Sequence, residues 1–274
     1  MNPELQKFLT AADESISRSS VNGYRGVVHV GVDLGTAYTG IFVLDENYYP
    51  LVATYRYAEV VRDGLVVDFG GAVALVKELK AELEKRLGFE LQSAATAFPP
   101  GVPAAEVRAG RYVLEAAGMN CTALVDEPTA ANSVLKVDNG AVVDIGGGTT
   151  GIAVVKDGEV VYTADEATGG THFTLVIAGG QKISFQEAEV IKIDPKQQDR
   201  LLNVVRPVME KVGSIIARHI REHTVEKLYL VGGTSAFTGI GQVIEQVTGV
   251  RTVVPGNPLF ITPLGIAMHD QKTL

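Results

Sequence analysis

The sequence lacks the features that would mark a secreted or membrane-spanning protein. Cys121 is its only cysteine, so no intramolecular disulfide can form, which fits the reducing cytoplasm. No apolar run approaches the roughly 18 to 20 residues that a membrane-spanning helix needs. The polar, acidic N-terminus also lacks the charged-then-apolar pattern of a signal peptide. We therefore expect a soluble cytoplasmic protein.

Basic residues are too few to balance the acidic ones. The chain has 24 Lys and Arg against 32 Asp and Glu, a formal net charge of −8. Nucleic acids and anionic membranes both bind through basic surfaces, so neither is expected as a primary partner. The 274 residues, 46% of them apolar, suffice for a substantial core in one large domain or two closely associated ones.

Two segments of the chain repeat one pattern without a gap. The first begins with Asp33-Leu34-Gly35 and the second with Asp144-Ile145-Gly146, and matching positions lie 111 residues apart. In each copy an apolar strand enters an acidic residue, a glycine-rich turn follows, and a β-branched strand leaves. The repeat predicts two similar lobes, each with a hairpin whose turn exposes backbone N–H groups.

Strands and helices alternate through the rest of the sequence. We predict helices at 72–87 and 106–117 and strands at 93–98 and 121–125, then helices at 171–178, 185–193 and 200–220 before a strand at 227–231. This order indicates an α/β fold. A helix over 3–18 precedes the first hairpin, and its apolar face either packs on the body or serves as a detachable docking or encapsulation segment.

The repeated turns are suited to a polyphosphate with a divalent metal. Carboxylate oxygens hold such a metal, and glycines let backbone donors approach phosphate closely. The candidates are Gly31, Asp33, Gly35 and Thr36 in the first copy, and Asp144, Gly146, Gly147, Gly148 and Thr149 in the second. A single Asp-Gly turn is usually only a hairpin, so the functional interpretation rests on the repetition.

Other glycine pairs and one charged pair point to a nucleoside. Gly169 and Gly170 open the helix predicted at 171–178, and the strand ending at Val231 runs into Gly232, Gly233 and Thr234. A glycine pair there lets the backbone lie flat against a base or ribose, although an ordinary strand-to-helix turn looks the same. Glu189 and Lys192 share one helix face and could reach ribose hydroxyls and a base edge, or form a solvated ion pair.

The order of these segments resembles that of the actin-like ATPase superfamily. Asp33-Leu34-Gly35-Thr36, Asp126-Glu127-Pro128-Thr129-Ala130-Ala131, the turn at 144–149 and Leu230-Val231-Gly232-Gly233 are similar to its phosphate 1, connect 1, phosphate 2 and adenosine segments. The residues in these segments are most similar to those of the DnaK-type chaperone nucleotide domain, FtsA and MreB. The short length is similar to the chaperone-like proteins of ethanolamine utilisation in bacterial microcompartments.

The resemblance implies a two-lobed actin-like, ribonuclease H-like α/β fold with duplicated sheets, a nucleotide cleft and reduced peripheral subdomains. It implies an appendage at 1–26, lobe I at 27–133 and lobe II at 134–274, whose last helix returns to lobe I. ATP would bind with Mg²⁺ near Asp33 and Asp144, with Thr36 and Thr149 on phosphate oxygens, Glu127 orienting water or metal, and Glu189, Lys192, Gly232 and Gly233 at the adenosine. Pro128–Ala131 and Gly265–Ala267 would cross where the lobes hinge.

Two departures from the resembled family suggest weak catalysis. Gly151 stands where DnaK-type chaperones carry a second carboxylate, and the stretch from Phe69 to Phe98 offers no match for their catalytic lysine. Each missing group costs on the order of 10² to 10³ in rate. The expected function is therefore an ATP-binding chaperone or reactivating accessory, at most a slow ATPase, whose partner is an enzyme such as ethanolamine ammonia-lyase or a microcompartment component.

Two alternatives stay open at this point. A small-molecule kinase of the same superfamily would need a carboxylate aimed at a substrate hydroxyl, for which Glu127 and Asp68 are the only candidates. A scaffold like FtsA or MreB would polymerise with nucleotide as its switch. The expected location is the cytoplasm or, within it, a bacterial microcompartment, whereas the oligomeric state does not follow from the sequence.

Overall fold

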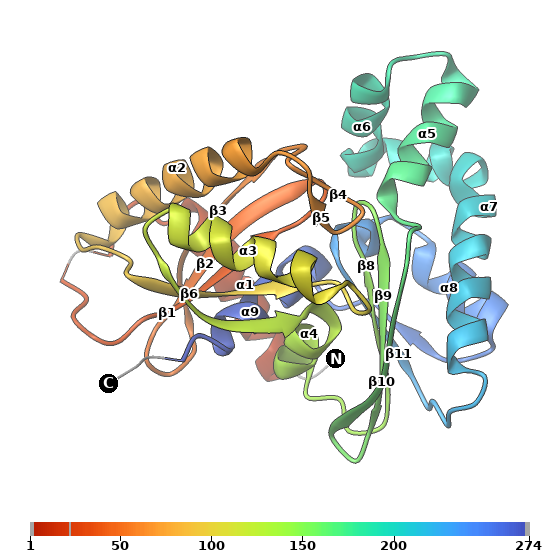
Figure 1. Ribbon diagram of the computed structural model, residues 1–274. Coiled ribbons are helices and arrows are strands. Elements are labelled where there is room, and N and C mark those ends of the chain that lie inside the picture. The colour runs from red at the N-terminus through yellow and green to blue at the C-terminus, as the bar shows by residue number, and fades with distance from the viewer. Residues whose placement is uncertain (1–2, 22, 272–274) are drawn as a thin grey trace. The chain divides into compact units, whose positions relative to one another are not determined.

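A computed structural model describes residues 3–21 and 23–271 of the chain (Figure 1). The chain folds as two compact units. The first unit extends to Lys136 and resumes at Phe260, and the second comprises Val137–Leu259. The chain thus passes from the first unit to the second and back again.

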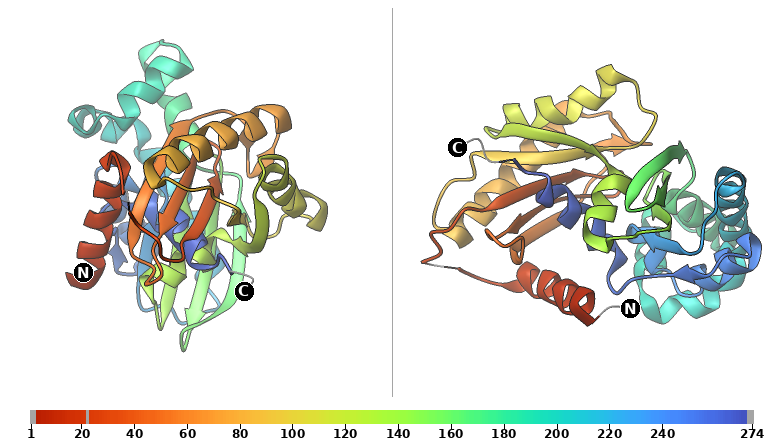
Figure 2. Two further views of the ribbon diagram at one scale, coloured as in Figure 1. Left: turned by 90° about the vertical axis from the view of Figure 1, so that its left-hand side faces the viewer. Right: turned by 90° about the horizontal axis from the view of Figure 1, so that it is seen from below.

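The first unit is built on a five-stranded sheet with the order β3-β2-β1-β6-β7. Its strands are β1 (His29–Leu34), β2 (Tyr38–Leu44), β3 (Pro50–Tyr57), β6 (Ser93–Phe98) and β7 (Asn120–Asp126), and β4 (Val61–Arg62) and β5 (Leu65–Val66) form a separate small hairpin. Helices α2 (Phe69–Leu87) and α3 (Ala104–Ala116) cover one face of the sheet. Helices α4 (Glu127–Leu135) and α9 (Ile261–Met268) cover the other (Figure 2).

The second unit repeats this plan with the order β10-β9-β8-β11-β12. Its strands are β8 (Gly140–Ile145), β9 (Thr150–Lys156), β10 (Glu159–Glu166), β11 (Leu228–Val231) and β12 (Thr252–Val253). In both sheets the first three strands in sequence are antiparallel neighbours and the last two join in parallel. The two sheets therefore share one topology, as the repeat in the sequence predicts.

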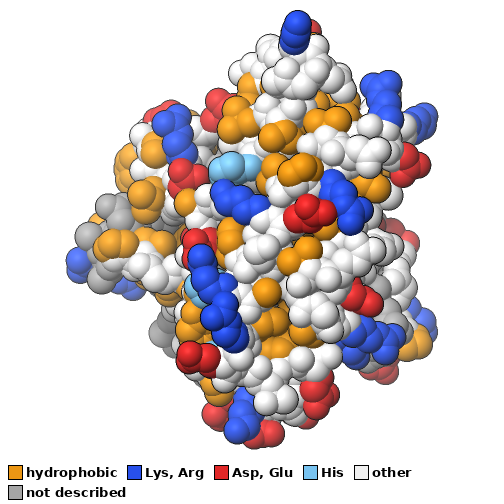
Figure 3. All heavy atoms as spheres, turned by 90° about the vertical axis from the view of Figure 1, so that its right-hand side faces the viewer, with side chains coloured by type: hydrophobic (Ala, Val, Ile, Leu, Met, Phe, Trp, Pro, Cys, Tyr) orange, Lys and Arg blue, Asp and Glu red, His pale blue; other side chains and the backbone are white. Residues whose placement is uncertain are grey.

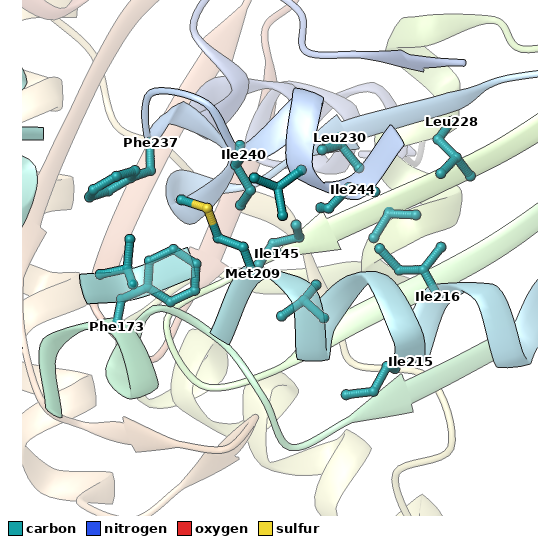
Figure 4. Packing of buried hydrophobic residues seen from close by; sticks show 14 of the residues in the cluster. Ile145, Phe173, Met209, Ile215, Ile216, Leu228, Leu230, Phe237, Ile240 and Ile244 are labelled. Atoms are coloured by element: carbon teal, nitrogen blue, oxygen red, sulfur yellow. The ribbon is translucent and has the colours of Figure 1, made fainter. Parts of the chain in front are cut away.

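The second unit has four helices: α5 (Gly170–Gln181), α6 (Phe185–Ile193), α7 (Pro195–Ile220) and α8 (Ile240–Thr248). Helices α7 and α8 pack against the sheet and each other, and α5 and α6 pack against each other and against α7. Large apolar side chains from α5, α7, α8 and the strands pack together in one buried core (Figure 4). The buried cluster includes Ile145, Phe173, Met209, Ile216, Leu228, Leu230, Ile240 and Ile244. This core fixes the helix ends that carry the candidate site.

Helix α7 begins earlier than the sequence pattern predicts. Asp194 accepts a hydrogen bond from the Lys196 amide at 3.0 Å, and Pro195 occupies the first helical position, where its missing N–H costs nothing. The glycine pair after β11 opens only a short 3-10 turn, Gly233–Ala236, and the α-helix α8 starts at Ile240.

Helices α4 and α9 approach each other at small residues within the first unit. A Cβ placed on Gly265 would lie 1.8 Å from the carbonyl oxygen of Ala130, so no larger residue fits there. This contact joins the two segments to which the sequence assigns a hinge. Their hinge role stays a prediction.

Helix α1 (Pro3–Ser17) is docked on the first unit, as one of the two sequence-based alternatives predicts. Leu9 and Ala12 are buried, and α1 lies along β3. The Arg86 guanidinium donates to the carbonyls of Ser15, Ile16, Arg18 and Ala53 at distances from 2.6 to 3.1 Å. Elsewhere in the fold, no helix among the described residues is long and apolar enough to cross a membrane.

Candidate functional site

The repeated turns have the same geometry in both units. Asp33 pairs with Gly40 across β1 and β2, and Asp144 pairs with Gly151 across β8 and β9. In each turn the amide of the following glycine, Gly35 or Gly146, donates to a carbonyl three residues later at 3.0 Å. Asp144 is 6% exposed. Equal register and equal turn bonds place the two carboxylates at equivalent positions of equivalent hairpins.

The turn after Asp144 is braced by the start of α5. The Gly146 carbonyl accepts from the Gly170 amide at 2.9 Å and from Thr234 Oγ1 at 2.7 Å, and the Gly147 carbonyl accepts from the Thr171 amide at 2.7 Å. A Cβ on Gly169 would lie 2.7 Å from the Gly146 oxygen. These contacts hold the turn rigidly, so Gly169, Gly170 and Thr234 position it.

A buried polar cluster lies directly beside Gly170. Lys192 Nζ donates to Glu189 Oε2 at 2.7 Å, to Thr174 Oγ1 at 3.0 Å and to the Gly170 carbonyl at 3.3 Å. Thr174 Oγ1 lies 2.5 Å from Glu189 Oε2. The side chains of Glu189 and Lys192 are each only 11% exposed. Glu189 and Lys192 therefore form a desolvated pair attached to α5, and the solvated-pair alternative is wrong.

Burial changes the proton affinity of the lysine. Removal of Lys192 from water lowers its pKa, and the attraction of Glu189 opposes that shift. A buried charge pair costs desolvation that only good geometry and additional hydrogen bonds offset. Thr174 and the Gly170 carbonyl supply these bonds, which leaves a fixed set of donors and acceptors next to the Asp144 turn.

The second glycine pair closes the other side of this turn. Gly232 has a φ of +84°, and a Cβ on it would lie 2.2 Å from Asp144 Oδ1. Thr234 follows on the 3-10 turn and bonds to Gly146, while Gly233 is exposed. In the second unit the structure thus brings together Asp144, Gly146, Gly147, Gly169, Gly170, Glu189, Lys192, Gly232 and Thr234, with Gly148 and Thr149 completing the turn.

The candidates of the first unit divide into two groups. Asp33, Gly35 and Thr36 are partly exposed at the end of β1 and its turn. Gly31, in contrast, faces α9, where a Cβ would lie 2.4 Å from the Ala267 amide nitrogen, so its evident role is close helix packing. Glu127 is the first residue of α4, and its neighbour Asp126 caps the helix by accepting from the Thr129 amide at 3.0 Å.

Two residues of these arrangements escaped the sequence analysis. Thr174 lies four residues after Gly170 on α5, one helical turn away, and this spacing could have identified it once the helix start was known. Asp126 precedes Glu-Pro at a helix start, the position that capping residues prefer, and could have been separated from Glu127 on that ground.

The residues of the second unit fit a nucleotide with magnesium. Gly170 lies so close to this cluster that no side chain fits, since a Cβ on it would lie 2.4 Å from Thr234 Oγ1 and 3.2 Å from Lys192 Nζ. Ammonium, hydroxyl and carboxylate groups converge there, and all three types hydrogen-bond ribose and base edges. No group of three metal-binding side chains occurs among the described residues. Magnesium bound to phosphates needs only one or two carboxylates, which Asp144 can supply.

Known proteins share part of this sequence and have this fold. Residues 106–262 match the family model of the type IV pilus assembly protein PilM. The structure superposes on MreB 5 of Spiroplasma citri bound to AMPPNP with a TM-score of 0.73 and 16% identity, covering 89% of this chain and 96% of that one. At this identity the likeness shows the fold alone.

Two relatives are much more similar. The ethanolamine utilization protein EutJ of Salmonella typhimurium is 42% identical over 268 residues, 97% of this chain and 92% of the relative. The crystal structure of EutJ from Carboxydothermus hydrogenoformans has a TM-score of 0.92 and 45% identity, covering 97% of this chain and 98% of that one. The chain therefore belongs to the family of the ethanolamine utilization protein EutJ and has the actin-like ATPase fold that this family shares with PilM and MreB.

Proposed function

We propose that this protein binds ATP with magnesium and acts as a chaperone-like or reactivating accessory of ethanolamine utilisation, with slow or no hydrolysis. The observation that carries the proposal is the buried Lys192–Glu189–Thr174 cluster, fixed next to the braced turn of Asp144. Such a desolvated set of donors and acceptors is costly to maintain, which favours a binding role.

Each part of the site has its own task in this proposal. Asp144 would hold the magnesium ion, which compensates phosphate charge when bound. The amides of Gly146, Gly147 and Gly148 and the Thr149 hydroxyl would contact phosphate, and Glu189 and Lys192 would contact the ribose or base. That the Asp33 turn, with Gly35 and Thr36, serves the same nucleotide is part of the proposal and stays a prediction.

Weak hydrolysis is expected because the hairpin carries no second carboxylate opposite Asp144, the proposed metal ligand. The residue paired with Asp144 across the hairpin is Gly151, which offers no second carboxylate. Glu127 at the start of α4 is the proposed group for orienting the attacking water. With fewer charges to stabilise the transition state, nucleotide would act mainly as a ligand that stabilises one conformation.

In this proposal, the conformation that nucleotide stabilises acts on a protein partner. We infer that the partner belongs to ethanolamine utilisation, either ethanolamine ammonia-lyase or a microcompartment component, and that the protein works in the cytoplasm or within that compartment. The support for this inference is the family membership.

Calorimetry with the purified protein tests nucleotide binding. We expect ATP to bind in the presence of magnesium and to bind far more weakly without it. Glu189→Gln, which keeps the side-chain size, should weaken binding about tenfold or more, whereas Glu78→Gln on the exposed face of α2 should not. A folded protein that shows no magnesium-dependent binding of adenine nucleotide would remove the proposal.

A nucleotide-switched scaffold is the second candidate, favoured by the fold that the chain shares with MreB. In that case the protein would form polymers when ATP is added. Analytical sedimentation with and without nucleotide separates the two candidates, because an accessory protein keeps its size whereas a scaffold grows.

A further inference from the structure

The outer face of α7 carries a strip of cations without a carboxylate. At 100° per residue, eight positions fall within an arc of about 100° on the side opposite the core. They are Lys196, Arg200, Asn203, Val204, Pro207, Lys211, Ser214 and Arg218, all exposed. We call these residues the α7 strip. In a chain with a net charge of −8, the strip carries four cations and no carboxylate, and Asp199 and Glu210 lie just beyond one of its edges.

Most of this charge is not neutralised within the protein. Arg218 forms an ion pair with Glu166. Among the described residues, Lys196, Arg200 and Lys211 take part in no ion pair. The carboxylates of α7 lie off the strip, and one of them, Glu210, pairs with Arg206 at 2.8 Å. Three exposed cations are thus available to an acidic ligand.

Apolar and small residues accompany these cations. Val204, which is 37% exposed, lies between Arg200 and Lys211, and Pro207 lies beside them. The strip borders the C-terminal end of α5, because a Cβ on Gly180 would lie 3.7 Å from Val204 Cγ1. Helix α5 contains no Asp, Glu, Lys or Arg. Figure 3, seen from the side of α7, shows Lys and Arg side chains on this face together with apolar side chains and some Asp and Glu side chains.

We propose that the α7 strip is a docking surface for an acidic amphipathic helix of a partner protein. The cations lie between Lys196 and Arg218, about 33 Å apart along the helix, so a partner helix of similar length would place carboxylates opposite Arg200 and Lys211. Its apolar residues would cover Val204, Pro207 and the glycine end of α5. Charge complementarity fixes the register and speeds encounter.

The strip suits this ligand better than other polyanions. Three unpaired cations on a protein of net charge −8 are a weak basis for nucleic-acid binding, which depends on releasing counterions from many phosphates. An anionic membrane would require a broad apolar face, and Val204 and Pro207 do not form one. The proposal rests on the proposed function only in requiring a protein partner, and docking itself needs no nucleotide.

Fluorescence anisotropy without nucleotide tests the proposal. The probe is a labelled helical peptide with glutamates at the spacing of Lys196, Arg200 and Lys211 and leucines on the same side; its counterpart carries lysines instead. The wild-type protein should bind the acidic peptide, more weakly at higher salt, and should not bind the basic one. The double variant Arg200→Glu, Lys211→Glu should lose affinity about tenfold or more.

A matched control separates the surface from the total charge. Lys77→Glu, Lys85→Glu makes the same charge change on exposed positions of α2 and should leave peptide binding unchanged. Equal peptide affinities of wild type and the α7 variant, absence of binding, or a preference for duplex DNA or anionic vesicles would overturn the proposal. Thermal unfolding verifies that the variants fold, and calorimetry with ATP shows independently whether the nucleotide site is intact.

Discussion

Asp144 and Gly232 are in such close contact that no side chain fits between them. A Cβ on Gly232 would lie 2.2 Å from Asp144 Oδ1 and 2.6 Å from the Ile145 carbonyl oxygen. The glycine also has a φ of +84°, a conformation that other residues rarely adopt. The carboxylate at the centre of the candidate site is therefore positioned by a backbone that only glycine can form.

Replacing Gly232 by alanine should destabilise the second unit. Backbone strain contributes about 1 to 2 kcal/mol, and displacement of Asp144 and β8 about as much again. Gly249→Ala is the matched control, because Gly249 has a φ of +69° and nothing within 4 Å of a Cβ. Denaturant unfolding should show the larger loss for Gly232→Ala. Equal losses would mean that strain alone matters and that the contact with Asp144 is unimportant.

Gly265→Ala should damage the first unit more severely. The new methyl group would collide with the Ala130 carbonyl oxygen at 1.8 Å, and residues 265 and 130 lie in packed helices whose backbones cannot easily move. We expect a loss above about 3 kcal/mol or failure to fold. At Gly179, a helical position with open space, alanine should instead stabilise by about 0.5 to 1 kcal/mol. A Gly265→Ala protein of normal stability would contradict the close packing of α4 and α9.

Arg86→Lys should release helix α1 without unfolding the body. A lysine keeps the charge, but its ammonium cannot reach four separate carbonyls as the planar guanidinium does. Loss of these charge-assisted bonds should cost about 2 to 3 kcal/mol. Hydrogen exchange in residues 3–17 should therefore accelerate, while exchange in β1 and β2 changes little. Unchanged protection of α1 would show that its apolar face alone holds it.

His269 should make the first unit less stable in mild acid. Burial lowers its pKa, Asp126 opposes that shift, and Lys136 adds to it. Its ring nitrogen Nε2 lies 2.8 Å from Ser133 Oγ. Because the folded pKa is below the value of about 6.5 for the unfolded chain, the unfolded state binds the proton more readily. Stability is full above about pH 6.5 and falls as the pH decreases through the folded pKa.

The variant His269→Gln tests this assignment because glutamine can bond to Ser133 without titrating. Unfolding free energies measured from pH 5 to pH 7.5 should have a smaller slope for the variant than for the wild type. Parallel curves would assign the acid sensitivity to other groups.

The sequence predicts the sheets well because their signals are local and repeated. The spacing of Asp33 and Asp144, each followed by a glycine turn, predicts two similar hairpins, and the two sheets have the same order. Helix α6 (Phe185–Ile193) has its predicted bounds, because Ser184 and Glu187 form a capping box that is legible in sequence.

Contacts between distant segments could not be predicted in this way. Nothing near Gly31 in sequence indicates that it packs against Ala267, and a ligand role was as reasonable as a packing role. The burial of Glu189 and Lys192 likewise depends on Thr174 and Gly170 on another helix. An i, i+3 charge pair looks the same in sequence whether it is solvated or buried.

Thermal unfolding of wild type and Asp144→Asn with magnesium and ATP tests the central claim most directly. At about 100 times the dissociation constant, bound nucleotide should stabilise the wild type by about 2.7 kcal/mol, a rise of roughly 5 °C in melting temperature. Asp157→Asn, at an exposed turn of the same unit, should keep this rise. Asp144→Asn should lose most of it. A rise of the same size in Asp144→Asn would contradict the claim that this turn holds the nucleotide.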